Sequence, residues 1–254
     1  HGGREAAAFC SEELATHVLG PTPAAATDKE SRAALVRGIA RAEQRLTAAG
    51  TASGSTALLV MLQRGGSCLN LAWVGDTKAV LCRGGRALPL TFDHRPTHLS
   101  ERARVLAVKE ATIEAGRLNG HLSLSRSLGC TSANTRRKPP GLSAIPEVRS
   151  EPLNPADEFV LLATDGLWDV LSPDEAVRIA RAHFAAYEDP FMVAEQLVAS
   201  ALHKGADDNV TVMILRLVVP SAATAPARGT PQKVPRVGDM RTPTKSVTFC
   251  DTTF

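Results

Sequence analysis

Apolar side chains recur every three or four residues along two early stretches of the chain, which is the spacing of an amphipathic helix. The first stretch, residues 4–19, is followed by a Gly20-Pro21 stop. Its apolar face consists of Phe9, Cys10, Leu14 and Val18. The second stretch, residues 27–49, opens with Thr27 and Glu30 at the spacing of a capping box. Two helices are therefore expected before residue 50.

Short apolar runs separated by glycine-containing turns replace the helical spacing between residues 57 and 90. Runs of this length, bounded by Gly-Gly or Gly-Asp, are typical of β-strands joined by tight turns. Their close succession predicts a meander of antiparallel hairpins. The expected strands are residues 57–63, 68–74, 78–83 and 86–90.

The rest of the chain alternates helical and strand-like patterns. Residues 100–110 are expected to form a helix, and the polar residues 130–143 a surface loop. Ser172-Pro173-Asp174-Glu175 and Asp189-Pro190 open two further helices, because each places a capping side chain before a proline in the first turn. The expected strands are residues around Ile113, residues 121–127, Phe159–Ala163 and residues 210–218.

Strands that accompany two pairs of helices favour an α+β fold, in which antiparallel sheets are covered by helices, over alternating βαβ units. With 254 residues and a hydrophobic content of 44%, the chain can bury one sizeable core. Apolar periodicity ends near residue 219. Residues 220–254 are basic and rich in Pro and Thr, so we expect a disordered tail there and no second folded domain.

Charge and cysteine content argue against several classes of function. The tail holds five basic and two acidic residues, which accounts for the whole net charge of +3, so the neutral remainder argues against nucleic acid as the main ligand. The longest apolar run, residues 210–219, contains Arg216 and is too short to cross a membrane. The cysteines are odd in number and scattered, which predicts reduced thiols in a cytoplasmic or nuclear protein. They are Cys10, Cys68, Cys82, Cys130 and Cys250.

Three acidic residues lie where expected strands begin or end. Asp165 follows a buried run of apolar residues, Asp76 follows an earlier strand, and Asp208 precedes the last strand. A carboxylate at such a position is costly to desolvate unless it meets a cation, and Gly166 leaves room for close backbone approach. Asp165-Gly166 is also compatible with a simple turn. Three such sites together favour one shared site for a hard metal ion, which prefers oxygen ligands.

Seven short motifs resemble, in their order, those of the type 2C family of metal-dependent Ser/Thr protein phosphatases. They extend over nearly all of residues 1–219, and their joint occurrence is far more specific than any single motif. The motifs are His1-Gly2-Gly3, Ser53-Gly54-Ser55-Thr56-Ala57, Val74-Gly75-Asp76-Thr77-Lys78-Ala79, Thr91-Phe92-Asp93-His94-Arg95-Pro96, Arg117-Leu118-Asn119-Gly120 with Leu122-Ser123-Leu124-Ser125-Arg126, Asp165-Gly166-Leu167-Trp168-Asp169, and Asp208-Asn209.

The resemblance implies one catalytic domain over residues 1–219, a β-sandwich of two packed antiparallel sheets with helices on both outer faces. It also implies hydrolysis of phosphoserine and phosphothreonine in phosphoprotein substrates, by a water activated at a binuclear magnesium or manganese site with two or more ions. Asp165 and Asp208 match ligands of the core metal pair. Asp76 matches a residue that contributes with Asp165 to an additional metal position, and His1 matches the proposed general acid.

The chain departs from the family pattern at two places that concern the site. Family members carry an Asp-Gly pair directly before the residue matching His1, and an arginine with acidic residues further upstream. We therefore expect the sequence to be incomplete at its N-terminus, without the first strands and part of the metal site. Cys130 stands where members usually have aspartate, which removes a charge near the site. The alternative function is a catalytically weak or inactive phosphatase-like pseudoenzyme that acts as a binding or regulatory module.

Several other residues have a candidate role. Arg126 is placed either to contact phosphate or to form a structural ion pair, and we favour the ion pair. His94 is expected to order its loop by local hydrogen bonds. The run Arg136-Arg137-Lys138 is either a solvated face or a surface that attracts acidic or phosphorylated segments. In the tail, Lys245, Val247 and Phe249 resemble a short motif that docks on protein phosphatase type one as an added strand.

Overall fold

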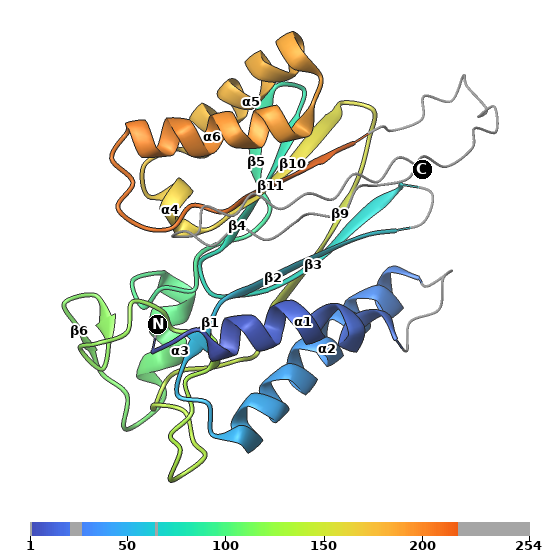
Figure 1. Cartoon of the computed structure of the whole chain (residues 1–254). Coiled ribbons are helices and arrows are strands. Elements are labelled where there is room, and N and C mark those ends of the chain that lie inside the picture. The colour runs from blue at the N-terminus through green and yellow to red at the C-terminus, as the bar shows by residue number, and fades with distance from the viewer. Residues whose placement is uncertain (1, 21–26, 64–65, 218–254) are drawn as a thin grey trace. The chain divides into compact units, whose positions relative to one another are not determined.

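The structure is a computed structural model that describes residues 2–20, 27–63 and 66–217. The chain divides into two compact units, and Figure 1 labels their helices and strands. Unit 1 consists of His1–Ala79 and Pro89–Leu153, and unit 2 consists of Val80–Leu88 and Asn154–Phe254. The tail expected from residue 220, including the segment with Lys245, Val247 and Phe249, lies outside the described residues.

Unit 1 is built on a three-stranded antiparallel sheet with two helices packed against it. The central strand β3 is buried along its whole length and pairs with β2 on one side and β9 on the other. Alternate residues such as Ala72 and Val74 face the apolar sides of α1 and α2, which fixes the register. The elements are α1 (Glu5–Leu19), α2 (Asp28–Ala49), β2 (Ala57–Leu62), β3 (Cys68–Val74) and β9 (Glu147–Pro152).

The start of α2 confirms the local prediction. The hydroxyl of Thr27 accepts a hydrogen bond from the backbone N–H of Glu30, and the Glu30 carboxylate accepts one from the backbone N–H of Thr27. These contacts satisfy two amide groups that the helix itself cannot pair. The helix ends at Ala49, immediately before Gly50.

The remainder of unit 1 consists of short elements and irregular backbone. The expected strand at residues 121–127 is wrong, because its amides pair with separate segments: Ser125 N–H donates to the His94 carbonyl, and Ser127 N–H to the Ser143 carbonyl. The loop expected at 130–143 is irregular, as predicted. The elements are β1 (Gly54–Ser55), α3 (Leu99–Leu106), β6 (Ile113–Glu114), β7 (Arg117–Leu118) and β8 (Leu128–Gly129).

Unit 2 contains a four-stranded sheet in the order β11-β10-β4-β5 with α5 and α6 packed on it. The predicted strand Phe159–Ala163 belongs to the interior strand β10, whose alternate residues Phe159, Leu161 and Ala163 enter the core beneath the two helices. The elements are β4 (Lys78–Arg83), β5 (Arg86–Pro89), β10 (Asp157–Ala163), α4 (Asp165–Trp168), α5 (Pro173–Tyr187), α6 (Pro190–His203) and β11 (Val212–Arg216).

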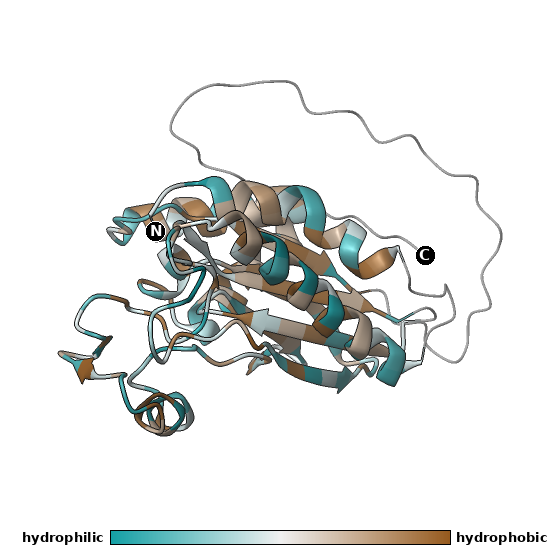
Figure 2. Ribbon diagram, turned by 90° about the horizontal axis from the view of Figure 1, so that it is seen from below, coloured by the Kyte–Doolittle hydropathy of each residue, from teal (hydrophilic) through white to brown (hydrophobic). Residues whose placement is uncertain are grey.

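The distribution of hydropathy agrees with this layering. Figure 2 shows mostly hydrophobic residues along the interior strands and an alternation of hydrophobic and hydrophilic residues along the helices. The α+β fold class, with helix-covered antiparallel sheets, is therefore confirmed. The predicted meander is wrong as one continuous sheet, because β3 and β4 belong to different sheets although they follow each other in the chain, whereas β2 pairs with β3 and β4 with β5 as expected. None of the helices in the described ranges is long and apolar enough to span a membrane.

Candidate metal centre

Asp165 stands at the exit of β10, where the strand passes directly into α4. Thr164 keeps an extended backbone (φ −73°, ψ 167°), and the short helix begins at the next residue. The indole N–H of Trp168 donates to the carbonyl of Ala163 at 2.8 Å, and Leu167 is fully buried. These two side chains anchor α4 to the end of the strand, so Asp165 stands at the end of the interior strand β10 and is half-buried.

The segment between α6 and β11, which carries Asp208, lies beside the end of β10. The Thr164 hydroxyl donates to the Asn209 carbonyl at 3.2 Å and accepts from the Thr211 backbone N–H at 3.1 Å. The Thr164 N–H in turn donates to the Thr211 carbonyl at 3.1 Å. Three hydrogen bonds from one threonine therefore fasten the segment that carries Asp208 beside the segment that carries Asp165.

Gly166 permits this close approach. A Cβ atom at position 166 would lie 2.5 Å from the Asn209 carbonyl oxygen, a distance that real Cβ atoms essentially never show. Any larger residue would push the Asp208 segment away. The sequence predicted room for backbone approach at Gly166, whereas Thr164 was missed, because a lone threonine before Asp-Gly carries no motif of its own.

Asp76 belongs to unit 1 and lies in the turn that follows β3. Its carboxylate is 6% exposed, and its Oδ2 accepts from Arg95 Nε at 3.0 Å and lies 2.9 Å from Arg95 Nη2. Gly75 has φ +109°, and a side chain there would overlap the methyl group of Thr56. The turn therefore depends on glycine, and the acid that follows it is already paired with a guanidinium.

The segment with His94 fastens this turn from the other side. The backbone N–H of Gly75 donates to His94 Nδ1 at 3.0 Å, and the His94 N–H donates to the Gly75 carbonyl at 3.1 Å. Burial, helped by the positive charge of Arg126, lowers the pKa of His94 to about 3, so the ring is neutral and its Nδ1 can accept. His94 does order its loop by hydrogen bonds, but the prediction of a local partner is wrong, because the partner is Gly75, 19 positions earlier in the chain.

Arg126 forms the ion pair that we favoured. Its Nη2 lies 2.6 Å from Glu101 Oε1 and 2.7 Å from Glu147 Oε1, and its side chain is 8% exposed. Burial opposes ionisation of Glu101, but hydrogen bonds from Arg126, Arg104 and Ser125 lower the pKa of its carboxyl to about 2. This buried network is structural, and the guanidinium of Arg126 is engaged within it.

Two of the three basic residues in the run 136–138 make contacts that stabilise the fold. Arg136 donates to the Ala48 carbonyl at 2.8 Å, and Lys138 pairs with Glu43 at 3.0 Å. Arg137 is exposed and lines a cavity of about 400 Å³ together with Cys130. That the run attracts acidic or phosphorylated segments stays a prediction. Arg137 is the residue of the run that is best placed for such an interaction.

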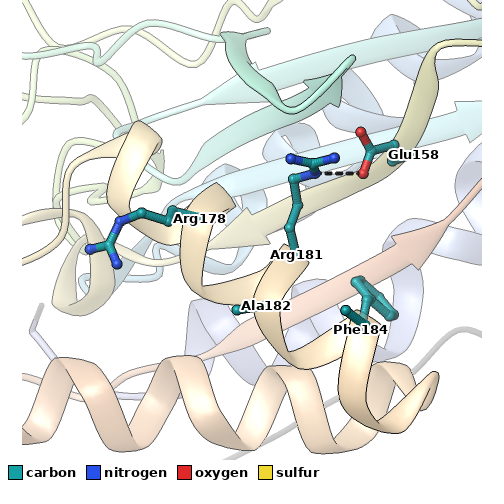
Figure 3. A pocket seen from close by; sticks show the side chains of 6 residues that line it. Glu158, Arg178, Arg181, Ala182 and Phe184 are labelled. Atoms are coloured by element: carbon teal, nitrogen blue, oxygen red, sulfur yellow. Dashed lines mark hydrogen bonds and ion pairs between the residues drawn. The ribbon is translucent and has the colours of Figure 1, made fainter.

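Another hollow, of about 510 Å³, lies on the outer side of unit 2, and its close-up is Figure 3. Arg181 on α5 donates to Glu158 on β10 at 2.8 Å, whereas Arg178 points away from this pair. Arg181 is neutralised by Glu158, and Arg178 does not point toward this pair. The hollow therefore lacks the few polar groups, directed at one point, that are typical of a ligand site.

The acids near the exit of β10 have the donor atoms of a metal site, but not their full number. Asp165 and Asp208 offer carboxylate oxygens, which suit magnesium and manganese. Within the described ranges, however, no three His, Cys, Asp or Glu side chains stand close enough together to hold an ion. His1 lies outside those ranges. The carboxylate oxygens are therefore of the kind that magnesium and manganese prefer. The described residues supply only part of the six ligands that an octahedral ion needs.

Helix-covered antiparallel sheets, with acids at the strand ends, define the fold class as α+β. The chain belongs to the protein phosphatase 2C family, whose model matches residues 1–210. The confirmed resemblance covers most of the sequence.

Individual relatives agree with this assignment. The chain is 33% identical over 219 residues to "Probable protein phosphatase 2C 54" of Oryza sativa subsp. japonica, covering 85% of this chain and 59% of that protein. It is 34% identical over 224 residues to "Probable protein phosphatase 2C 59" of Arabidopsis thaliana, covering 85% and 67%. The "Structure of a C.elegans sex determining protein" superimposes with a TM-score of 0.71 at 26% identity, covering 84% of this chain and 53% of that one. The chain thus spans between half and two thirds of these relatives.

Proposed function

We propose that the chain carries out the hydrolysis of phosphoserine and phosphothreonine in proteins, as part of a metal-dependent Ser/Thr phosphatase. The observation that carries the proposal is the close approach of the backbone segments next to Asp165 and Asp208, through Thr164 and Gly166, in a chain of the protein phosphatase 2C family.

Each predicted site residue has a part in the proposal. Asp165 and Asp208 would hold the core ions, and Asp76 would contribute to an additional ion. Bound magnesium or manganese, in two or more ions, would supply Lewis acidity and a water ionised at neutral pH. In the reaction, a water oxygen bonds to phosphorus as the bond to the serine or threonine oxygen breaks, and His1 as general acid would give that oxygen its proton.

The state of the cysteines supports a cytoplasmic or nuclear location, which belongs to the same proposal. Cys10, Cys68, Cys82 and Cys130 are buried thiols outside any disulfide. Burial raises the pKa of Cys10 and of Cys82 to about 11. Buried protonated thiols are inert packing residues rather than reactive groups.

The test is manganese-dependent hydrolysis of an aryl phosphate and a phosphothreonine peptide by the natural protein. Asp165→Asn and Asp208→Asn remove one candidate ligand each, and Asp207→Asn is the matched control, since Asp207 is an exposed neighbour of Asp208. We expect activity that needs manganese, disappears in the first two variants and persists in the control. A folded protein that hydrolyses neither compound would refute the proposal and favour a binding or regulatory module.

A further inference from the structure

The ion pair between Asp76 and Arg95 carries an inference about how a cation is bound at Asp76. We infer that Arg95 is a tethered competitor: its guanidinium occupies the Asp76 carboxylate until a divalent ion displaces it. The inference rests on the proposed function only in taking Asp76 as a metal ligand. Arg95, rather than the acid itself, then sets the metal concentration at which that position fills.

The two partners differ in burial, and the difference identifies the one that can leave. The Asp76 side chain is 6% exposed, whereas the Arg95 side chain is 34% exposed. A buried carboxylate needs a positive partner, because an unpaired charge is costly to desolvate. Arg95 meets this need in the described structure and, being partly solvated, can withdraw its head group to water.

Arg95 directs both of its contacting nitrogens to the same oxygen. Nε and Nη2 lie 3.0 Å and 2.9 Å from Oδ2 of Asp76. A metal ion prefers the same negative oxygen and cannot share it with a guanidinium at hydrogen-bond distance, because two positive charges would then lie within a few ångströms of each other. Occupation by Arg95 and coordination by an ion through Oδ2 are therefore alternatives.

The turn that carries Asp76 is held by contacts that do not involve the Arg95 side chain. Gly75 exchanges two hydrogen bonds with His94, and Lys78 pairs with Asp93 at 3.2 Å. The hydroxyls of Thr56 and Thr77 are 2.7 Å apart and are hydrogen-bonded. Removal of the guanidinium should therefore take away the competing charge without displacing the backbone beneath the carboxylate.

The experiment measures binding of manganese ions to the whole 254-residue chain by isothermal titration calorimetry, with no substrate present. Asp76→Asn identifies the binding step that depends on Asp76. We expect Arg95→Gln to tighten that step about fivefold, the size of a partly exposed ion pair. Arg102→Gln, which removes an exposed arginine of α3, is the matched charge control and should leave the step unchanged.

The melting temperature supplies a second readout. Without metal, Arg95→Gln should melt below the wild type because the ion pair with Asp76 is lost, whereas the rise in melting temperature on adding manganese should be larger in the variant. If Arg95→Gln does not fold, Arg95→Lys is the alternative variant, because lysine keeps the positive charge but lacks the forked geometry of the guanidinium. In this variant we expect manganese to bind about twofold more tightly in the Asp76-dependent step.

Three outcomes would overturn the inference: an unchanged Asp76-dependent step in Arg95→Gln, a weaker step, or no Asp76-dependent step in any of the proteins. Failure of the proposed function would appear separately, as absence of phosphate release. Manganese binding would still be measurable in that case, so the two failures are distinguishable.

Discussion

Replacement of Glu101 by glutamine is the sharpest test of the buried charge network in unit 1. Glu101 is 1% exposed, and its carboxylate accepts hydrogen bonds from Arg126, Arg104 and Ser125. The shortest bond from each of these residues is between 2.6 and 2.8 Å long. Loss of one partner from a buried ion pair costs about 3–5 kcal/mol, since the remaining charge stays buried. Lowering of the pKa from 4.5 to about 2 corresponds independently to roughly 3 kcal/mol at neutral pH.

The assay is the free energy of unfolding from urea titrations of wild type and Glu101→Gln, measured at several pH values. The folded-state pKa lies below the unfolded value, so the contribution of Glu101 is fully present above about pH 4.5 and is lost as the pH falls toward 2. The difference between the two proteins should therefore be about 3 kcal/mol at pH 7. At pH 3.5 the difference in unfolding free energy should be roughly 1.4 kcal/mol smaller than at pH 7.

A surface pair supplies the control for this experiment. Glu158 pairs with Arg181 at 2.8 Å, but the two side chains are 35% and 50% exposed. Glu158→Gln should cost less than about 1 kcal/mol, because solvent screens exposed pairs. A loss below about 1 kcal/mol in Glu101→Gln as well, or a difference that does not change between pH 7 and pH 3.5, would refute the reasoning about burial.

Three further predictions concern the candidate site and the core. Gly166→Ala should destabilise the protein by about 1–3 kcal/mol and weaken manganese binding, because its Cβ would collide with the Asn209 carbonyl; thermal melts and metal titration check both. Thr164→Val should cost about 1–2 kcal/mol by the same melts, whereas Thr164→Ser should restore most of it, since the serine keeps the hydroxyl. Native Cys10 and Cys82 should react with a thiol reagent at pH 8 far more slowly than in urea, and equal rates would contradict their burial.

Elements whose cause is local could be predicted from the sequence. The capping box of Thr27 and Glu30 and that of Ser172 and Glu175 both form, because the partners are three residues apart. Strand pairing could not be predicted in the same way. β3 pairs with β9, which lies more than seventy residues further along the chain, and no turn signal specifies such a partner. The predicted meander was wrong for that reason.

In the candidate site, too, local features could be predicted from the sequence and long-range contacts could not. The acids at positions 76, 165 and 208 could be found because glycine or asparagine beside an acid at a strand end is visible in the sequence. Their surroundings could not, because they depend on tertiary contacts. Arg95 contacts Asp76 from 19 positions further along the chain, and Arg126 contacts Glu101 from 25 positions further along. The ligand roles of the acids stay predictions, while the contacts that position them are part of the fold.

Uncharged residues determine where the acids of unit 2 stand. Thr164 and Gly166 place the Asp165 and Asp208 segments side by side without contributing a charge. A site of this kind depends on ligand positions to within about half an ångström. Substitution of an acid removes a ligand and changes the net charge, whereas substitution of Thr164 or Gly166 moves ligands at constant charge. Weaker manganese binding in the uncharged variants would therefore show that the geometry of the acids, and not merely the negative potential around them, holds the ion.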